Sequence, residues 1–196
     1  MARRLVFKFG SGVLTSDERV DLDGAQFVGL TQAIARLCKA GDECVVVSSG
    51  AVAAGLTSFG LDVRPTSLEV LQACAAVGQT RLMQYYESLF RLHGLHVGQL
   101  LLTHDDLRTP ERRGNVSNTL NQLLSFPKTI PVINENDSVA VEELRYGDND
   151  LLSSDVATLV EADVLVLLTS VDGLLHPETS ELVSRVDDID DVLDYA

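Results

Sequence analysis

The sequence has few of the features that mark membrane or disulfide-bonded proteins. No apolar run approaches the ~20 residues that a helix needs to cross a bilayer. The amino-terminal segment, MARRLVFKFG, has only a short apolar run and no small-residue cleavage site, so it predicts a first strand rather than a signal peptide. The cysteines (Cys38, Cys44 and Cys74) are odd in number and lack CxxC spacing. We therefore expect reduced, buried cysteines in a cytoplasmic protein without a membrane segment.

Cations are also scarce, and this shortage limits the classes of partner. The 196 residues carry 15 Lys+Arg against 29 Asp+Glu, a net charge of −14, and the acidic excess lies in the second half of the chain. Nucleic-acid binding requires clustered cations, so we expect no nucleic-acid partner. His93 and His96 have no Cys or carboxylate companions at metal-site spacing, which argues against a zinc site. An anionic ligand such as ATP would depend on a few local cations, a metal ion and helix N-termini.

What the sequence does contain is a regular alternation of strand-like and helix-like segments. We predict strands over residues 4–9, 44–47, 97–102, 130–133, 164–168 and 182–186, and helices over 23–40, 66–92, 112–126 and from 147–150 to about 161. Thr66 and Glu69 fit a capping box for the second helix, which Gly78 is expected to interrupt. This order predicts one α/β domain over residues 1–196 with a mainly parallel sheet covered by helices on both faces.

Polar side chains gather in one stretch, Ile130 to Gly173, around which the chain is organised. The strand at 130–133 runs into Asn134-Glu135-Asn136-Asp137, and Gly147-Asp148-Asn149-Asp150 opens the next helix. Ligands of open α/β sheets bind just past the carboxyl ends of the strands. These two clusters are therefore the first candidates for a functional site.

Two glycine-containing turns follow other strands. Gly10-Ser11-Gly12 follows the first strand, with Lys8 near that strand's end, and Ser48-Ser49-Gly50 follows the strand at 44–47. Such turns point backbone N–H groups at an anion, and Lys8 could reach the same anion. The order of Lys and Gly differs from a Walker A loop. A purely structural turn is the alternative reading at both positions.

Together, these groups favour a particular kind of chemistry. Carboxylates hold an ammonium group and backbone N–H groups hold carboxylates, so the loops suit a small zwitterion, while a lysine with glycine turns suits a polyphosphate. No Ser–His or Cys–His nucleophile pair is evident. Phosphoryl transfer needs none, because it rests on positioning and charge neutralisation.

Seven segments, in this order, resemble the glutamate 5-kinases of the amino acid kinase superfamily. They are FKFGSGVLT, VVSSGAVAAG, LQACAAVGQTRL, HVGQLLLT, PVINENDSVA, YGDNDLLSSDVA and LLTSVDGL, and they cover essentially the whole chain. PVINENDSVA with GDNDLLS is the most specific part, since other members of the superfamily differ in these loops. The resemblance implies a three-layer α/β/α sandwich, and transfer of the ATP γ-phosphoryl group to the γ-carboxylate of L-glutamate as the first step of proline biosynthesis.

The resemblance also implies roles for residues that match the motifs. Lys8 would bind the transferring phosphate, and Asp150 would orient the side chain of Lys8. Other residues would line the substrate and nucleotide sites: Ser49, Gly50, Asn134, Asp137, Asp148 and Asn149 for glutamate, and Gly10, Thr169 and Ser170, with Lys8, for ATP. Mg²⁺ is expected on the phosphates rather than on a set of protein ligands. Feedback inhibition by L-proline and a homo-oligomeric state are further expectations.

The sequence departs from the family pattern at two places. Gly12 stands where members usually have Ser or Thr. Members also continue into a Gly-Gly-Met loop with a second phosphate-binding lysine, and often into a further domain, whereas this sequence ends at Ala196 before that loop. We therefore expect a kinase domain truncated at its C-terminal end. The alternative is a catalytically silent amino-acid-binding or sensing domain derived from the same family.

Overall fold

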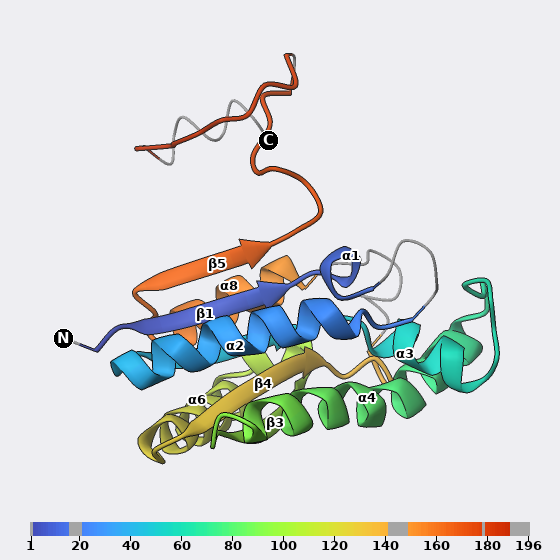
Figure 1. Cartoon of the computed structure of the whole chain (residues 1–196), viewed down its shortest axis with the longest axis horizontal. Coiled ribbons are helices and arrows are strands. Elements are labelled where there is room, and N and C mark those ends of the chain that lie inside the picture. The colour runs from blue at the N-terminus through green and yellow to red at the C-terminus, as the bar shows by residue number, and fades with distance from the viewer. Residues whose placement is uncertain (1, 16–20, 141–148, 178, 189–196) are drawn as a thin grey trace.

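The computed structural model describes residues 2–15, 21–140, 149–177 and 179–188 (Figure 1). Within them, five strands form one sheet in the order β3-β4-β2-β1-β5, and every pair of neighbours is parallel. The strands are β1 (Arg4–Phe9), β2 (Glu43–Ser48), β3 (His96–Leu102), β4 (Thr129–Glu135) and β5 (Val164–Leu168). All their carboxyl ends therefore lie at one edge of the sheet, as the sequence predicted for the polar clusters.

Helices connect the strands and cover both faces of the sheet (Figure 1). They are α1 (Ser11–Leu14), α2 (Gly24–Ala40), α3 (Ala51–Ser58), α4 (Leu68–Arg91), α5 (His104–Arg108), α6 (Pro110–Ser125) and α8 (Asp150–Leu159). Helices α2 and α4 pack on one face, and α5, α6 and α8 pack on the other. The result is the three-layer α/β/α arrangement that we expected. None of the helices in the described ranges combines the length and apolar character that a bilayer crossing requires.

The two cores follow from the alternation of side chains along each strand. Leu5 and Phe9 of β1 face the layer of α2 and α4, where Phe27, Tyr86 and other large side chains are fully buried. Val6 faces the opposite layer, which α6 and α8 complete. Because alternate residues share a face, Lys8 points to the same side as Val6, toward α8. This placement matters for the site.

The helix predictions were correct in type and differ at some ends. Helix α2 begins after Asp23, whose carboxylate accepts from two backbone N–H groups, and ends at Gly41 in the left-handed conformation. The capping box predicted at Thr66 is wrong, because α4 begins at Leu68, and the Ser67 hydroxyl donates to the Glu69 carboxylate instead. Gly78 does not interrupt α4, which is continuous to Arg91.

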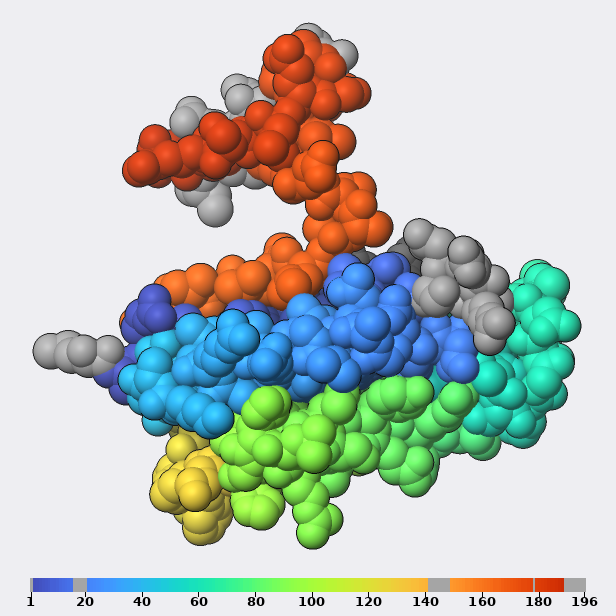
Figure 2. All heavy atoms as spheres, viewed as in Figure 1, coloured from blue at the N-terminus to red at the C-terminus, as the bar shows by residue number. Residues whose placement is uncertain are grey.

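The strand predicted at 182–186 is also wrong. Beyond β5 the chain leaves the body of the molecule (Figures 1 and 2), and its only pairing among the described residues of this segment is one isolated bridge between Leu175 and Leu182. Both leucines are exposed, so the segment has no sheet or helix against which to bury an apolar face. An apolar run forms a stable strand only when a ladder and a packing partner are both present.

Candidate active site

Lys8 and Asp150 form a close ion pair at the carboxyl edge of the sheet. Lys8 lies on β1 between β2 and β5 and is 5% exposed, and its Nζ atom is 2.5 Å from Oδ1 of Asp150. Asp150 is the first residue of α8, and its side chain is half-exposed. The contact follows from the strand alternation, which directs Lys8 toward the helix layer that contains α8. The pair holds the ammonium group of a buried lysine at the edge of the sheet, with the aspartate on its solvent side.

The turn after β1 lies beside this lysine. The backbone N–H of Gly10 donates to the carbonyl oxygen of Leu168 at the end of β5, and a Cβ on Gly10 would lie 3.5 Å from Nζ of Lys8. A Cβ on Gly12 would lie 3.3 Å from the hydroxyl oxygen of Ser170. Thr169 and Ser170 are both exposed. The structure thus brings Lys8, Gly10 and the segment just after β5 together at one edge of the sheet.

The second glycine turn connects β2 to α3. Gly50 has φ of +99°, a left-handed conformation that glycine adopts without strain, and it precedes the first residue of α3, Ala51. The N–H of Ser49 donates to the carbonyl oxygen of Phe9, which ties this turn to β1. The first N–H groups of α3 have no acceptor inside the helix and carry its positive dipole end. This arrangement favours a carboxylate near Ser49 and Gly50.

A buried cluster of amide groups connects the strand ends with α8. The side-chain Nδ2 of Asn149 donates to the carbonyl oxygen of Ser48, to the hydroxyl oxygen of Ser49 and to Oδ1 of Asn134, at 2.8, 3.1 and 3.0 Å. An Nδ2 group has two hydrogens, so these three contacts share them. Asn149 is fully buried, and its own Oδ1 has no hydrogen-bond partner among the described residues. That oxygen is an acceptor positioned for a ligand.

A cavity of about 250 Å³ lies next to this amide cluster. Its lining includes Gln79 and Thr80 of α4, Ala51 of α3, Glu135 at the end of β4 and Asp137 just after that strand. Glu135 and Asp137 are both buried. Burial, with a smaller contribution from the charge of Glu135, raises the pKa of Asp137 to about 7, and Arg64 acts in the opposite direction. Two acidic groups in one small cavity favour a cationic ligand, because an ammonium group would offset both the burial of the carboxylates and the repulsion between them.

Gln79 is a site residue that the sequence analysis did not identify. Its Oε1 accepts from Nδ2 of Asn134 at 2.9 Å, and its Nε2 is buried without a hydrogen-bond partner in the described part of the chain. Gln79 therefore fixes one end of the amide cluster, lines the cavity and has a donor available for a ligand. The helical periodicity of α4 gave no signal for this role, because a polar residue within a long helix is ordinarily solvent-exposed.

Asp148 and a magnesium ion were also expected at this site. Asp148 lies outside the described residues. No group of three or more His, Cys, Asp or Glu side chains within the described ranges has the spacing to hold a metal ion. The donor set at the site consists of one lysine, amides, hydroxyls and few carboxylates. It suits a magnesium ion carried mainly by nucleotide phosphates better than one held by a cage of protein ligands.

The chain is similar in sequence to glutamate 5-kinases of several bacteria. It is 51% identical to the glutamate 5-kinase of Thioalkalivibrio sulfidiphilus over 173 residues, which are 88% of this chain and 46% of that protein. It is 50% identical to the glutamate 5-kinase of Pseudomonas putida (strain W619) and 51% identical to that of Pseudomonas aeruginosa (strain UCBPP-PA14), each over 177 residues, 90% of this chain and 47% of the relative. The chain therefore spans about half the length of the curated relatives that it matches.

A match to the amino acid kinase family as a whole extends over residues 3–194. That range includes all five strands of the sheet and every residue of the site described above. The parallel sheet with helices on both faces agrees with this match, and so do the polar groups at the carboxyl ends of the strands. This chain belongs to the amino acid kinase family.

Proposed function

We propose that this chain is part of a glutamate 5-kinase, which transfers the γ-phosphoryl group of ATP to the γ-carboxylate of L-glutamate. The observation that carries the proposal is the Lys8–Asp150 ion pair beside a buried amide cluster and an acid-lined cavity. The name of the relatives, glutamate 5-kinase, supports the choice of glutamate. The product, L-glutamyl 5-phosphate, would enter proline biosynthesis as its first intermediate.

The geometry suggests how each end of glutamate would be held. Glu135 and Asp137 would receive the ammonium group in the cavity, which also includes Ala51 at the start of α3. The α3 N-terminus, with Ser49 and Gly50, would receive a carboxylate. Asn134 is hydrogen-bonded to Gln79 in the cavity wall, and Asn149 precedes Asp150, the partner of Lys8. These two asparagines, which are bonded to each other, would hold the body of the substrate. Asp148 is proposed as a neighbour of the same loop from the family resemblance alone.

Transfer between two anions requires neutralisation of charge. Lys8 would bind the transferring phosphoryl group, and Asp150 would hold the ammonium of Lys8 in position through their ion pair. Gly10, Thr169 and Ser170 would contact the nucleotide at the same edge of the sheet. Mg²⁺ bound to ATP would supply further positive charge at the phosphates. Feedback inhibition by L-proline and homo-oligomer formation remain part of the proposal through the family resemblance.

The test is formation of an acyl phosphate that depends on both substrates. Purified protein is incubated with Mg·ATP and L-glutamate, and the product is trapped with hydroxylamine as the hydroxamate. The chain is measured as it stands, and so is the protein expressed from the complete reading frame that contains this sequence. We expect hydroxamate that requires both ATP and L-glutamate, with D-glutamate and L-aspartate as control acceptors. Absence of product from the complete reading frame would overturn the kinase proposal.

One observation favours a second function, an amino-acid-binding domain without turnover. The sequence contains three lysines, and both Lys39 and Lys128 lie at the opposite edge of the sheet from Lys8, where they line a different cavity. Lys8 is thus the one lysine at the candidate site. Calorimetry with L-glutamate separates the two functions: binding without hydroxamate from the complete reading frame supports the silent domain, and binding with hydroxamate supports the kinase.

A further inference from the structure

A second cavity lies at the amino ends of the strands, at the opposite edge of the sheet from the candidate active site. Its volume is about 560 Å³, and it is bounded by the end of α2, the start of β2 and the turns that precede β3 and β4. Two of the three cysteines of the chain line it, Cys38 near the end of α2 and Cys44 in β2. Nothing in the proposed kinase reaction uses this cavity or its thiols.

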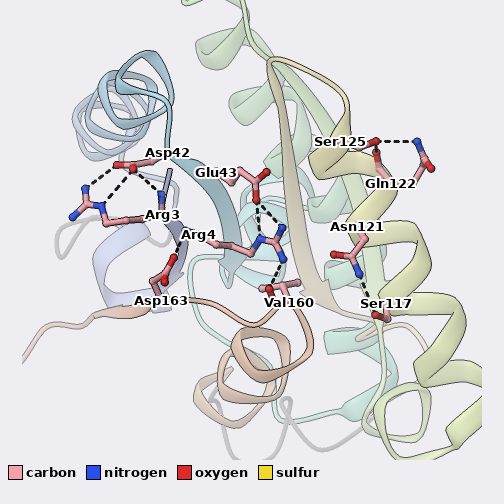
Figure 3. Close-up of polar contacts among 10 residues, drawn as sticks. All are labelled: Arg3, Arg4, Asp42, Glu43, Ser117, Asn121, Gln122, Ser125, Val160 and Asp163. Atoms are coloured by element: carbon pink, nitrogen blue, oxygen red, sulfur yellow. Dashed lines mark hydrogen bonds and ion pairs between the residues drawn. The ribbon is translucent and has the colours of Figure 1, made fainter. Parts of the chain in front are cut away.

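The turn that joins the two cysteines is held firmly. Gly41, in the left-handed conformation, donates from its N–H to the carbonyl oxygen of Cys38. Asp42 forms an ion pair with Arg3, and Glu43 forms one with Arg4 (Figure 3), so the acidic residues of the turn are both neutralised. Both cysteines therefore line the same cavity from a fixed helix end and a fixed strand rather than from a loose loop.

The two thiols differ in exposure and in acidity. Cys44 is 1% exposed, whereas Cys38 is half-buried at the cavity wall. A hydrogen bond between the two thiols lowers the pKa of Cys38 and raises the pKa of Cys44. Burial opposes the lowering of the pKa of Cys38 and adds to the raising of the pKa of Cys44. The more accessible sulfur is thus the better thiolate, and the buried sulfur lies beside it as a thiol.

We propose that Cys38 and Cys44 form a modification site for small hydroperoxides, which oxidise the pair to a disulfide across the α2–β2 turn. The Cys38 thiolate attacks one peroxide oxygen, the O–O bond breaks, and the leaving alkoxide or hydroxide takes a proton to become an alcohol or water. Cys38 is then a sulfenic acid. Cys44 then attacks that sulfur, the S–S bond forms, and the hydroxyl leaves with the thiol proton as water.

The cavity and the turn account for the selectivity of this step. The cavity gives a small oxidant access to Cys38, and the short turn keeps the resolving sulfur within reach. Cys74 is the matched internal control, because it is also buried and free but is packed between α3 and α4 without a second thiol beside it among the described residues. The disulfide would join the end of α2 to β2 and constrain the unfolded chain.

Hydrogen peroxide treatment followed by peptide mapping without reduction tests the proposal on the folded chain. Trypsin cleaves after Lys39, between the two cysteines, so the two peptides stay attached only when a disulfide joins them, and isolation of the monomer before digestion makes that disulfide intramolecular. Fragmentation of the attached pair assigns the bond to Cys44 or to Cys74. We expect a monomeric Cys38–Cys44 disulfide at low peroxide excess, a rise in Tm, and full reversal by dithiothreitol.

Two variants assign the roles of the sulfurs. In Cys44→Ser, oxidation should stop at a sulfenic acid on Cys38 that dimedone labels, and in Cys38→Ser the peroxide reaction should slow at least about tenfold. Attachment of the peptides through Cys74, equal oxidation of Cys74, or unchanged reactivity of Cys38→Ser would each overturn the proposal. Circular dichroism of each variant establishes that it is folded before the comparison is made. All these measurements are independent of kinase activity.

Discussion

At the level of single residues, the alternation of side chains along the strands sets the direction of the side chains that form the candidate site. Lys8 shares a face with Val6 and therefore points toward α8, where it meets Asp150. Asn134 shares the other face with Val132 and points toward α4, where it meets Gln79. Successive residues of a strand face opposite sides, so one sheet edge directs a cation to one layer and an amide to the other.

Replacement of Asp150 by Asn should remove the charge that positions Lys8. We expect kcat/KM of the hydroxamate reaction to fall by about two orders of magnitude or more, the scale of losing one positioned electrostatic group at a reacting centre. Asp155→Asn on the same helix is the matched control and should be close to wild type. Equal activity of the two variants, with equal Tm, would remove Asp150 from the proposed mechanism.

Asp137 should give the protein a distinct dependence of stability on pH. Its pKa is raised from 3.8 to about 7 in the folded state, so between these values the folded protein holds a proton that the unfolded chain has released. The free energy of unfolding contributed by this group is therefore highest at low pH and falls as pH rises toward 7. Asp137→Asn lacks this dependence.

Denaturant melts of the wild type and Asp137→Asn at about pH 5 and about pH 8 measure the difference. Taking the difference between the two proteins cancels the contributions of other carboxylates, such as Asp106, whose pKa is lowered. The stability of the variant relative to the wild type should increase from the lower to the higher pH. A difference that is constant with pH would show that Asp137 titrates normally.

Gln79 should affect substrate binding more than turnover. Gln79→Leu leaves Nδ2 of Asn134 without its acceptor in a buried position, which costs about 1–3 kcal/mol of stability. The amide cluster would then lose its fixed orientation, and the KM for L-glutamate should rise more than kcat falls. Gln26→Leu on the exposed face of α2 is the control for the apolar substitution. Unchanged KM in Gln79→Leu would place this residue outside the site.

Among the elements, the closest approach is between α3 and α4. A Cβ on Gly78 would lie 1.8 Å from the carbonyl oxygen of Ala51, and one on Gly55 would lie 1.9 Å from that of Cys74. The two helices therefore cross backbone to backbone at these glycines. This crossing fixes the start of α3, whose first residue lines the acid-lined cavity. The sequence analysis predicted that Gly78 interrupts the helix, whereas in the structure its lack of a side chain allows α3 and α4 to pack closely.

Gly78→Ala should therefore destabilise the protein strongly. The added methyl group meets backbone atoms that cannot rotate away, so we expect a loss of about 3 kcal/mol or more in the free energy of unfolding. Gly29→Ala on α2 is the matched control: no atom lies within 4 Å of its added Cβ, and alanine favours the helix by up to about 1 kcal/mol. Denaturant unfolding of both variants provides the measurement, and similar stabilities would contradict the close crossing.

Some elements escaped the sequence analysis for a physical reason. Helix α5 is five residues long, too short for a periodic apolar signal, and it is defined by the capping box of Thr103 and Asp106. The pattern at 182–186 resembled a strand, yet no partner strand lies beside it in the described structure. Local patterns identify long elements well, because many residues contribute to the periodic signal, and they identify short elements poorly.

For the whole molecule, the net charge of −14 has a consequence for stability. Like charges repel in the compact state, and salt screens this repulsion over a Debye length of ~8–10 Å near physiological ionic strength. We expect Tm to rise by a few degrees when NaCl is increased from about 0.02 M to about 0.2 M. Choline chloride should give the same rise if screening is the cause. A Tm that is independent of salt would argue that the acidic residues are locally compensated.

The sequence by itself determined the order of strands and helices, the parallel sheet and the positions of the polar loops. These follow from short-range periodicity and from the turn chemistry of glycine, both of which are properties of neighbouring residues. Only the tertiary structure decided which side chains come together: the pairing of Lys8 with Asp150, the support of Asn134 by Gln79, and the placement of Cys38 and Cys44 in one cavity. The first two depend on strand order and helix docking between residues far apart in the chain, and the third depends on how the end of α2 meets β2. Such packing is set by the burial of the two cores rather than by any local pattern.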